Sequence, residues 1–580
     1  MRATGIKLVS LSALAAAWVL LAPAVAPAAI GDLTAKGCFE DAGPPDSHCG
    51  TGAENPGLYA ADSVAVSPDG KSVYVASTGD SAIAMFKRNT TTGALTSDGC
   101  ISDDSTFPAS GCADFAEGMS APNGVVVSPD GLDVYVVANG DDSVVHLERD
   151  TATGDLTPAE CVANTGDVAG CGGLTQKGLD SGRAIAIDPD GSAVYVVGGT
   201  GGGTGSVARL ARNTSTETLS PGTCISNAPD AFTCGAETAG LGNANDIAIS
   251  ADGESLHVAS RTGGVVSLTA PGLSPLGCFA DTDSAISGCT SAQGLSGAKG
   301  IAVSPDGKSV YARSDNDAAV VRFNRSNTGV LTSAGCIADT EAATNCGGGK
   351  ADGLSAGTAI AVSPDNESVY AVGGVPDQAI VTLDRDTATG AISDGGCINE
   401  TGAAGCDSTS YGLMSGSGVT VSPNGKSVYV TSTGSSALTR FDREGSGVEP
   451  PPNDVAVRTK KATCKGSCKA IKVKTEVGGP GTITFCNAPA GVNAPCKIAG
   501  NGPTPPKAVA RAKGKAKTIK TKTIDVAKAT TISAKLSLTP KAKKTIKGKG
   551  KLKVKLQVDF TPTRGELNSD RQTVTIKRNR

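Results

Sequence analysis

The chain has 580 residues, with 76 glycines, 18 cysteines, only 3% aromatic residues and a formal net charge of −4. This length allows more than one domain, and the sparse aromatics leave valine, isoleucine, leucine and alanine to build the core. No phosphate-binding loop, His-Glu-x-x-His motif or Gly-x-Ser-x-Gly elbow occurs in a strand–turn–helix context. The sequence therefore lacks the common signatures of nucleotide hydrolases, zinc proteases and α/β-hydrolases.

Residues 1–29 have the pattern of a secretory signal peptide. Arg2 and Lys7 precede an uncharged apolar run over 8–21, and small residues fill 24–29. We expect cleavage after Ala28 or Ala29, because Pro27 disfavours a cut directly after residue 26. An uncleaved membrane anchor is the alternative, although prolines interrupt the run. No later stretch has the roughly 20 apolar residues of a membrane span, so we expect no transmembrane segment after cleavage.

A turn motif, first seen as Ser67-Pro68-Asp69-Gly70, organises most of the chain. It occurs seven times, with successive starts 61, 60, 62, 54, 59 and 59 residues apart. Proline presets the second turn position, and glycine accepts a positive φ. Around each copy, four short β-branched runs are joined by tight turns, which predicts one four-stranded antiparallel sheet per repeat. The fold class is therefore all-β, and residues 30–446 are predicted to form a seven-bladed β-propeller.

The two ends of this region complement each other, which favours a closed ring over a solenoid. The seventh repeat stops after its third strand, at 437–443, without the Leu-Thr strand that follows in other repeats. The mature N-terminus supplies such a strand at 32–38, before the first full repeat. We predict that this strand completes the last blade in a 1+3 closure, which removes exposed sheet edges.

Fourteen cysteines occur as one pair per repeat, between the outer strand of one blade and the inner strand of the next. Only pairing within the loop treats all seven repeats alike, so it predicts seven disulfides and an oxidising compartment. Metal binding is disfavoured, since these loops contain almost no histidine and lack Cys-x-x-Cys spacing. The predicted pairs are Cys38–Cys49, Cys100–Cys112, Cys161–Cys171, Cys224–Cys234, Cys278–Cys289, Cys336–Cys346 and Cys397–Cys406.

Other recurring positions read as structural. An arginine ends the third strand in six repeats, and its regularity predicts pairing with turn acids or carbonyls. His257 stands where the other repeats have a core tyrosine, and we expect it to pack there. His146 occupies a slot that varies widely, which predicts a solvent-facing side chain. Asp-rich turns at 141–142 and 315–317 are either solvated turns or calcium ligands.

The inner strands begin at the mouth of a propeller channel, where functional sites usually lie. Counting back five positions from the residue that opens each turn gives one polar residue per repeat, and Asp246 adds an acid beside Asn245. This ring fits either a polar-ligand site or a wet funnel without a ligand. Its members are Asp62, Asn123, Arg183, Asn245, Lys299, Thr358 and Ser417.

The composition changes sharply after the repeats. Residues 447–460 read as a Pro/Gly-rich linker and 461–580 as a small basic β-sandwich-like domain. From 451 onward, 30 lysines and arginines face 6 acids, whereas the rest of the chain has a net charge of −28. Polar and apolar residues alternate over 549–560 and 573–577, as in strands, and 539–546 is a short helix or turn. Cys464, Cys468, Cys486 and Cys496 can form two disulfides or, less expectedly, a zinc site.

The repeats resemble the YVTN-type β-propellers of the lactonase-like superfamily. The residues that carry this resemblance are Ser-Pro-Asp-Gly-Lys-Ser-Val-Tyr-Val at 67–75, its near-copies at 304–312 and 422–430, and the Arg-Asp-x-x-Thr-Gly turns at 149–154 and 385–390. The resemblance implies the seven-bladed fold over about 30–446. One branch of the family resembles 6-phosphogluconolactonase, but the matching residues here are turns and core. The C-terminal region loosely resembles Lys-rich β-sandwich modules of secreted bacterial proteins.

No nucleophile or acid–base constellation stands out, so the sequence predicts a secreted, non-catalytic binding or scaffold propeller without cofactor or metal. The alternative is a lactonase-type hydrolase at the channel mouth, with Asp62 or Asp246 as base and Arg183 and Lys299 stabilising an oxyanion. The basic tail predicts attachment to an anionic cell-envelope polymer or docking onto a protein, including the acidic propeller itself. Lysines without interleaved aromatics argue against specific nucleic-acid binding. The oligomeric state stays open.

Overall fold

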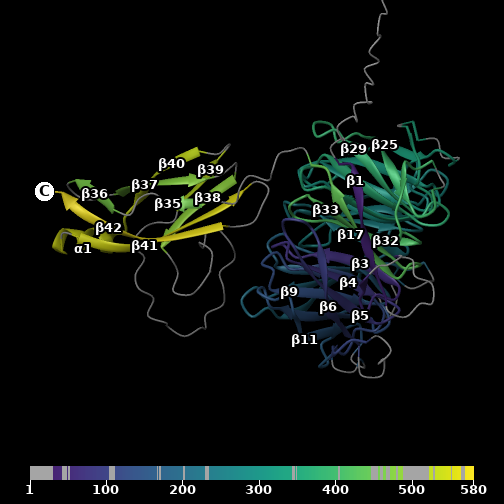
Figure 1. The fold of residues 1–580 in the computed structure, drawn as a ribbon, viewed down its shortest axis with the longest axis horizontal. Helices are drawn as coiled ribbons and strands as arrows, with labels where there is room; N and C mark the ends of the chain where they lie inside the picture. The colour runs from purple at the N-terminus through teal and green to yellow at the C-terminus, as the bar shows by residue number, and fades with distance from the viewer. Residues whose placement is uncertain are drawn as a thin grey trace, which may run out of the picture.

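The structure is a computed structural model, in which seven β-sheets are followed by further strands toward the C-terminus (Figure 1). It describes residues 31–445 apart from 42–48, 50–52, 104–110, 166–167, 169–170, 200–202, 229–233, 343–345, 348 and 403–404. Toward the C-terminus it describes 455–457, 461–465, 470–477, 481–487, 522–526, 530–549, 551–562 and 568–579. The predicted signal peptide and the residues that join the two parts lie outside these ranges.

The first three blades each contain four main strands, and blades one and three add a short fifth. Blade one is β3 (Ala61–Val66), β4 (Ser72–Ser77), β5 (Ala82–Arg88), β6 (Leu95–Ser102) and β7 (Asp114–Phe115). Blade two is β8 (Pro122–Val127), β9 (Asp133–Ala138), β10 (Ser143–Arg149) and β11 (Leu156–Ala163). Blade three is β12 (Gly182–Ile187), β13 (Ala193–Gly198), β14 (Ser206–Arg212), β15 (Leu219–Ser226) and β16 (Ala236–Glu237).

The next three blades repeat this order. Blade four is β17 (Ala244–Ile249), β18 (Ser255–Ser260), β19 (Gly264–Thr269), β20 (Pro275–Asp281) and β21 (Thr290–Ala292). Blade five is β22 (Ala298–Val303), β23 (Ser309–Ser314), β24 (Ala319–Arg325), β25 (Leu331–Asp339) and β26 (Lys350–Ala351). Blade six is β27 (Gly357–Val362), β28 (Ser368–Gly373), β29 (Ala379–Arg385), β30 (Ile392–Asn399) and β31 (Ser408–Thr409).

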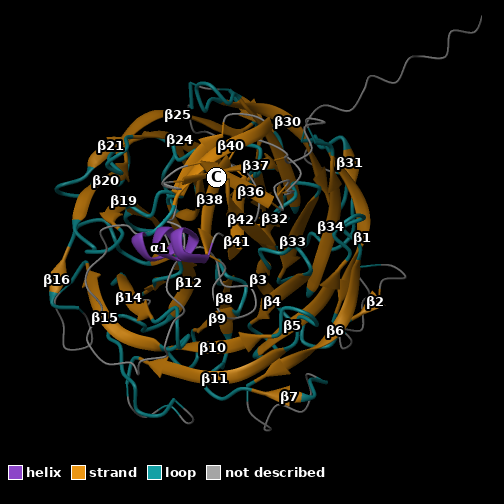
Figure 2. Ribbon diagram, turned by 90° about the vertical axis from the view of Figure 1, so that its left-hand side faces the viewer, coloured by secondary structure: helices purple, strands orange, loops and turns teal. Residues whose placement is uncertain are grey.

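Blade seven confirms the predicted closure. It joins β32 (Gly416–Val421), β33 (Ser427–Ser432) and β34 (Ala437–Arg443) to β1 (Leu33–Glu40) and β2 (Ala53–Glu54) from the start of the described chain. Leu33 pairs with Arg443 and Glu40 with Ala437 in antiparallel register. Figure 2 shows the outer strands, including β1, β6, β11 and β30, around the rim and β3, β8 and β12 nearer the centre.

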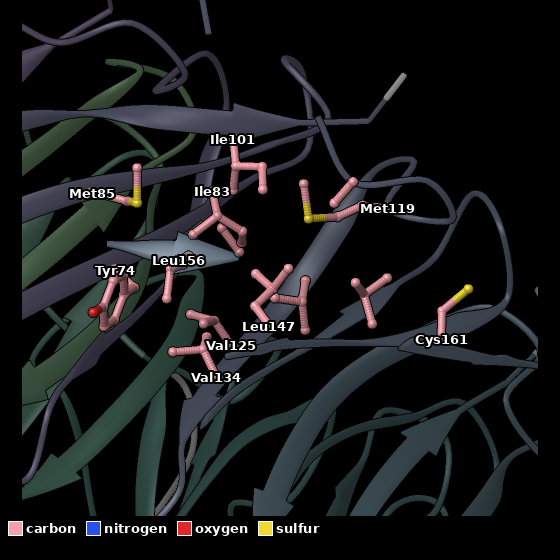
Figure 3. Packing of buried hydrophobic residues seen from close by; sticks show 14 of the residues in the cluster. Tyr74, Ile83, Met85, Ile101, Met119, Val125, Val134, Leu147, Leu156 and Cys161 are labelled. Atoms are coloured by element: carbon pink, nitrogen blue, oxygen red, sulfur yellow. The ribbon is translucent and has the colours of Figure 1, made fainter. Parts of the chain in front are cut away.

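The core lies between neighbouring blades. The second strand of every blade is buried along its whole length because both of its faces meet another sheet. Figure 3 shows Tyr74 and Ile83 of blade one in the same buried cluster as Val134 and Leu147 of blade two. Valine and isoleucine suit such strands, since their branched side chains fill the space between two pleated surfaces.

The turn motif closes each inner hairpin through its own side chains. The Ser67 hydroxyl donates to the Asp69 carboxylate at 2.6 Å and accepts from the amide of Ser72 at 3.0 Å. Gly70 has a φ of +67°, a left-handed conformation that glycine adopts without strain and that Asn366 has in the sixth copy. The same serine–aspartate bond recurs in four further copies, so the motif is structural, as the sequence predicts.

The recurring arginines connect adjacent blades at this turn end. Arg149 donates from Nε to the Tyr74 hydroxyl at 2.8 Å, from Nη1 to the Gly131 carbonyl at 2.9 Å and from Nη2 to the Asp69 carboxylate at 3.1 Å. The predicted pairing with turn acids and carbonyls is therefore confirmed. The arginines that make corresponding bonds are Arg88, Arg149, Arg212, Arg325, Arg385 and Arg443.

Blade four lacks this arginine. Ala270 occupies the equivalent position: the Ala270 amide donates to the Glu254 carbonyl, just as the Arg149 amide donates to the Leu132 carbonyl in blade two. The hydroxyl of Tyr195, in blade three, donates to the Asp188 carboxylate at 3.2 Å instead. This bond lies within blade three, so the junction between blades three and four lacks the arginine bonds that join the other blades.

All seven disulfides have the predicted pairing, with Cα–Cα distances between 4.6 and 5.6 Å. A glycine just before the inner strand of the same blade packs against each bridge; a Cβ added to Gly118, for example, would lie 2.9 Å from the Cys171 sulfur. Its φ of +81° and this close approach both require glycine. Each bridge therefore packs against the loop from which the inner strand of its own blade starts.

The prediction of a solvent-facing His146 is wrong. Its side chain is only 2% exposed, its Nε2 lies 2.8 Å from Asp133 Oδ1 and its ring stacks on Tyr135. Asp133 replaces the small hydroxyl residue that most blades have at this position, and it provides the buried polar partner. His257 is buried, as predicted, and bonds Ser255 and Ser267.

The Asp-rich turns cap backbone amides. Asp141 accepts from the amide of Ser120 at 2.9 Å, and Asp142 from that of Ser181 at 2.7 Å. The structure describes no group of three or more His, Cys, Asp or Glu side chains that could hold a metal ion. None of the described helices is long and apolar enough to cross a membrane.

The described C-terminal part forms two sheets and one helix. The first sheet contains β35 (Val455–Val457), β37 (Ala470–Val477) and β40 (Thr530–Ser537). The second contains β36 (Lys461–Lys465), β38 (Gly481–Asn487), β39 (Lys522–Val526), β41 (Lys551–Pro562) and β42 (Asn568–Asn579). The short helix expected near 539–546 is α1 (Pro540–Lys549). A sandwich of these sheets stays a prediction, and the side chains of the four C-terminal cysteines lie outside the described residues.

Candidate functional site

The seven predicted ring residues all occupy the second position of an inner strand. At this position the register of every inner strand shifts against its neighbour, as between Ala61 and Ser63 in blade one. The residue just before each inner strand has a positive φ, for example +54° at Ala60 and +48° at Ser181. Each inner strand therefore begins with a left-handed residue followed by a β-bulge.

This backbone geometry explains why the ring is polar. A bulge leaves one residue unpaired and re-aims its side chain, and bulges are common beside active sites. Here it directs seven side chains, one per blade, to a common opening. Together with Arg261 they line a hollow of about 240 Å³ at the mouth of the channel. The structure thus brings all seven predicted ring residues together.

A second hollow of similar volume lies on the inner side of the ring. It is lined by the same seven residues, by Asp246 and by small or apolar neighbours such as Val64 and Ile185. The two hollows share the ring as their common wall. A ligand at the mouth therefore meets the polar ring first and the starts of the inner strands behind it.

Asp62 is the acid of the ring. The Asn123 amide donates to its carboxylate at 3.2 Å. Burial raises the pKa of Asp62 to about 6, although the bond from Asn123 and the charge of Arg183 act in the opposite direction. A carboxyl with this pKa is ionised near neutral pH and can still accept a proton readily, as a general base must.

Arg183 is the cation of the ring whose charge acts on this acid. Its Nη1 lies 3.5 Å from Asn245 Oδ1, and its buried Nε finds no acceptor among the described residues. Burial, together with the charge of Arg261, lowers its pKa, although arginine stays protonated at any physiological pH. A donor that is buried and unsatisfied in this way is costly, and an anionic ligand can satisfy it.

Two residues at the mouth, Arg261 and Asp315, were not predicted from the sequence to contribute to the ring. Lys299 Nζ lies 2.6 Å from the Asp315 carboxylate, and Arg261 lies 3.7 Å from the same carboxylate. Arg261 and Asp315 both occupy the position directly after the second strand, in blades four and five. Comparing this position among the repeats reveals the signal, since the other blades have only threonine, asparagine or glycine there.

Asp246 has a different role from Asp62. One of its oxygens accepts from the amide of Ile247 and the other from that of Ile301 in the next blade, both at 2.8 Å. Burial raises its pKa to about 6, against the effect of these two bonds. Both oxygens are engaged in joining blades four and five, so Asp62 is the better placed of the two predicted bases.

Thr358 and Ser417 join adjacent blades in a similar way. The Thr358 hydroxyl donates to the Gly416 carbonyl at 2.7 Å, and the Ser417 hydroxyl donates to the Ala61 carbonyl at 2.8 Å. Asn245 likewise donates to the Lys299 carbonyl at 3.0 Å. The charged residues of the ring, Asp62, Arg183 and Lys299, are therefore the groups available to a ligand.

A family model described as a seven-bladed β-propeller lactonase matches residues 50–167 and 125–335. The propeller belongs to this lactonase-like family. The match covers the first five blades, and the remaining two continue the same repeat and strand order. The predicted resemblance is thus confirmed for the propeller, while the C-terminal part lies outside the match.

Solved structures with a similar fold include two from Bacteroides uniformis and Pseudomonas aeruginosa. The first, a putative 6-phosphogluconolactonase, is 19% identical, covers 62% of this chain and 88% of its own, and has a TM-score of 0.44. The second, a periplasmic gluconolactonase, is 17% identical with coverages of 63% and 88% and a TM-score of 0.44. A search of curated proteins finds no match.

Proposed function

We propose that the propeller hydrolyses the lactone of a small hydroxylated acid at its channel mouth. The observation that supports this most is that Asp62, with its raised pKa, lines the same hollow as Arg183 and Lys299. Membership of the lactonase-like family favours lactones among possible esters. The hollow suits a ligand of about one sugar unit, since pockets for larger ligands typically exceed about 300 Å³.

The reaction assigns one step to each group. Asp62 takes a proton from a water molecule as the water oxygen attacks the lactone carbonyl carbon, while the Asn123 amide holds the Asp62 carboxylate in place. Negative charge then develops on the former carbonyl oxygen, where Arg183 and Lys299 stabilise it. The ring C–O bond breaks as the carbonyl re-forms, and the leaving oxygen takes the proton back from Asp62. The product is the hydroxy acid, and Asp62 is again a carboxylate.

The test is a proton-release assay of the full mature protein with a panel of aldonolactones. Asp62→Asn should lower kcat by about 100-fold or more, the usual contribution of a general base. Asp114→Asn removes an equal charge from an exposed position in β7 and should leave turnover unchanged. The wild-type rate should fall as the pH drops through about 6, because Asp62 becomes protonated. Equal rates for both variants would contradict the proposal.

Binding without catalysis is the second candidate, and one contact favours it. The salt bridge between Lys299 and Asp315 neutralises one of the two groups assigned to the oxyanion. A mouth that only binds would hold aldonic acids with the same affinity in wild type and Asp62→Asn, lose them in Arg183→Gln, and turn over no lactone. Calorimetry with an aldonic acid, run beside the rate assay, separates the two candidates.

We also place the mature protein outside the cytoplasm. Seven disulfides occur in the described propeller, and disulfides persist in oxidising compartments. The signal-peptide pattern of residues 1–29 agrees with this location. Fractionation of cells, with the protein detected in the medium or the envelope, tests it.

A further inference from the structure

The lysines of the C-terminal part are concentrated where α1 meets β41. Seven lysines and no acid occur between residues 540 and 553, and all but Lys543 are exposed. The structure describes no ion pair that involves any of these lysines. This region, called the lysine track below, is therefore a concentrated and uncompensated positive surface.

The helix arranges its share of the track in a row. Ala542 and Ile546 are buried and face the sheet, which leaves Lys541, Lys544 and Lys547 along the opposite side. A spacing of three residues separates successive lysines by about 4.5 Å along the helix axis. Like charges at this spacing destabilise an isolated helix, so an anionic partner would stabilise α1.

The strand that follows extends the row. Lys551 and Lys553 are exposed, whereas Val554 and Leu556 are buried. Alternation along a strand puts both lysines on its outer face, about 6.6 Å apart. The first acid of β41 is Asp559, whose register partner is Ser569 in β42, beyond the lysine end of the strand. The positive row thus runs from the helix onto one end of the sheet.

We propose that the lysine track binds a linear phosphodiester polymer of the cell envelope. Its charges form a row, as a linear chain requires. They are ammonium groups on flexible stems, which bind phosphate as point charges, and the row has no arginine fork for bidentate carboxylate recognition. Among the C-terminal residues whose side-chain burial the structure describes, no large apolar one is exposed, and this favours charge binding over membrane insertion or base stacking. This binding is independent of the reaction proposed for the propeller.

The acidic propeller of the same chain is the competing occupant, since the residues before 451 have a net charge of −28. Docking there would neutralise the track without any polymer. A matched pair of variants separates the two occupants from a simple effect of net charge. One variant replaces Lys541, Lys544 and Lys547 by glutamine. The other replaces the exposed lysines Lys71, Lys308 and Lys426 of the propeller turns, so the charge change is the same.

The experiment measures binding of the full mature protein to purified poly(glycerol phosphate) at 50 mM salt, with polygalacturonate as the carboxylate polymer. The track variant should bind poly(glycerol phosphate) about tenfold to a hundredfold more weakly, since each lysine near an anionic surface contributes about a factor of five. The propeller variant should bind like the wild type. Polygalacturonate should bind more weakly than the phosphodiester polymer.

Three results would overturn the proposal. Equal losses in both variants would show that only net charge matters. Tighter binding of polygalacturonate would assign the track to carboxylate polymers. The third result combines two measurements: the wild type does not bind poly(glycerol phosphate), and after cleavage of the linker the C-terminal part of the track variant leaves the propeller faster than that of the wild type. This result would show that the lysine track docks onto the propeller. Far-ultraviolet circular dichroism checks that α1 stays folded in the track variant.

Discussion

The two faces of the propeller are built from the same strands, but equivalent residues are repeated at one face and varied at the other. At the turn end, six blades place an arginine in nearly the same set of bonds, and the bonds join each blade to its neighbour. At the channel mouth, seven equivalent positions hold six residue types, one acid and two cations among them. The repeated residues secure the ring, and this frees the variable ones to differ. Function is therefore best sought where the repeat varies.

The largest expected effect comes from breaking a regular junction. Arg385 is buried and donates to the Tyr311 hydroxyl at 2.7 Å and to the Asp306 carboxylate at 3.1 Å. Arg385→Met should lower the free energy of unfolding by about 3 kcal/mol, because it leaves buried partners unpaired. Urea denaturation measures this loss, and Lys308→Met on the neighbouring turn is the control. A loss below about 1 kcal/mol would show that these networks do not secure the ring.

Removing one disulfide should have a somewhat smaller and uniform effect. Cys336 and Cys346 close a loop with a separation of 10 residues, and Cys397 and Cys406 one of 9. Replacing either pair by alanine should cost about 2–3 kcal/mol in the chain-entropy model. Melting temperatures of the two variants should agree closely. A much larger loss in one blade would contradict the view that the bridges are interchangeable structural parts.

Asp62 and Asp306 should respond to pH in opposite directions. The pKa of Asp62 is raised from 3.8 to about 6, so the folded protein holds its proton longer than the unfolded chain. Ionisation of Asp62 therefore lowers the free energy of unfolding as the pH rises from the unfolded to the folded pKa, and the loss is constant at higher pH. Asp62→Asn should raise the free energy of unfolding by about 1–3 kcal/mol at pH 7 and leave it unchanged below about pH 4. Melting curves at both pH values test this. An unchanged or lower melting temperature at pH 7 would be inconsistent with a strained site acid.

The junction acid provides the contrast. A bond from Ser304, a backbone bond and the charge of Arg385 lower the pKa of Asp306, against the effect of burial. Its contribution to stability is therefore present above its unfolded pKa and is lost as the pH falls through its folded pKa. Asp306→Asn should destabilise the protein at pH 7, and the difference should shrink in acid. The same sign for both variants would erase the distinction between the two ends.

The smallest effect concerns the irregular junction. In Tyr74→Phe, the Gly154 carbonyl loses its donor and Arg149 Nε its acceptor, which should cost about 1–2 kcal/mol. Tyr195→Phe removes a single bond to Asp188, which also accepts from the Ser192 hydroxyl. Its cost should stay below about 1 kcal/mol. Equal costs in urea denaturation would mean that the junction without arginine is as dependent on its tyrosine as the others.

The repeat made the fold and the ring positions predictable, because a fixed period places equivalent residues at equivalent points of each blade. Counting back from each turn found all seven ring residues. It missed Arg261 and Asp315, which come from another strand and approach the ring only in three dimensions. It also gave no sign of the bulges that aim the ring inward. His146 was mispredicted because variation was read as exposure, when the compensating change was Asp133 on the neighbouring strand.

The most direct test of the central claim is a crystal structure of the full mature protein with a bound aldonic acid. We expect the acid in the mouth hollow, with its carboxylate between Arg183 and Lys299 and within hydrogen-bonding reach of Asp62. The Arg183 Nε–H, which finds no acceptor among the described residues, should then have one. Density for the acid only at the disulfide loops or the turn end, with the mouth holding water at saturating concentration, would contradict it.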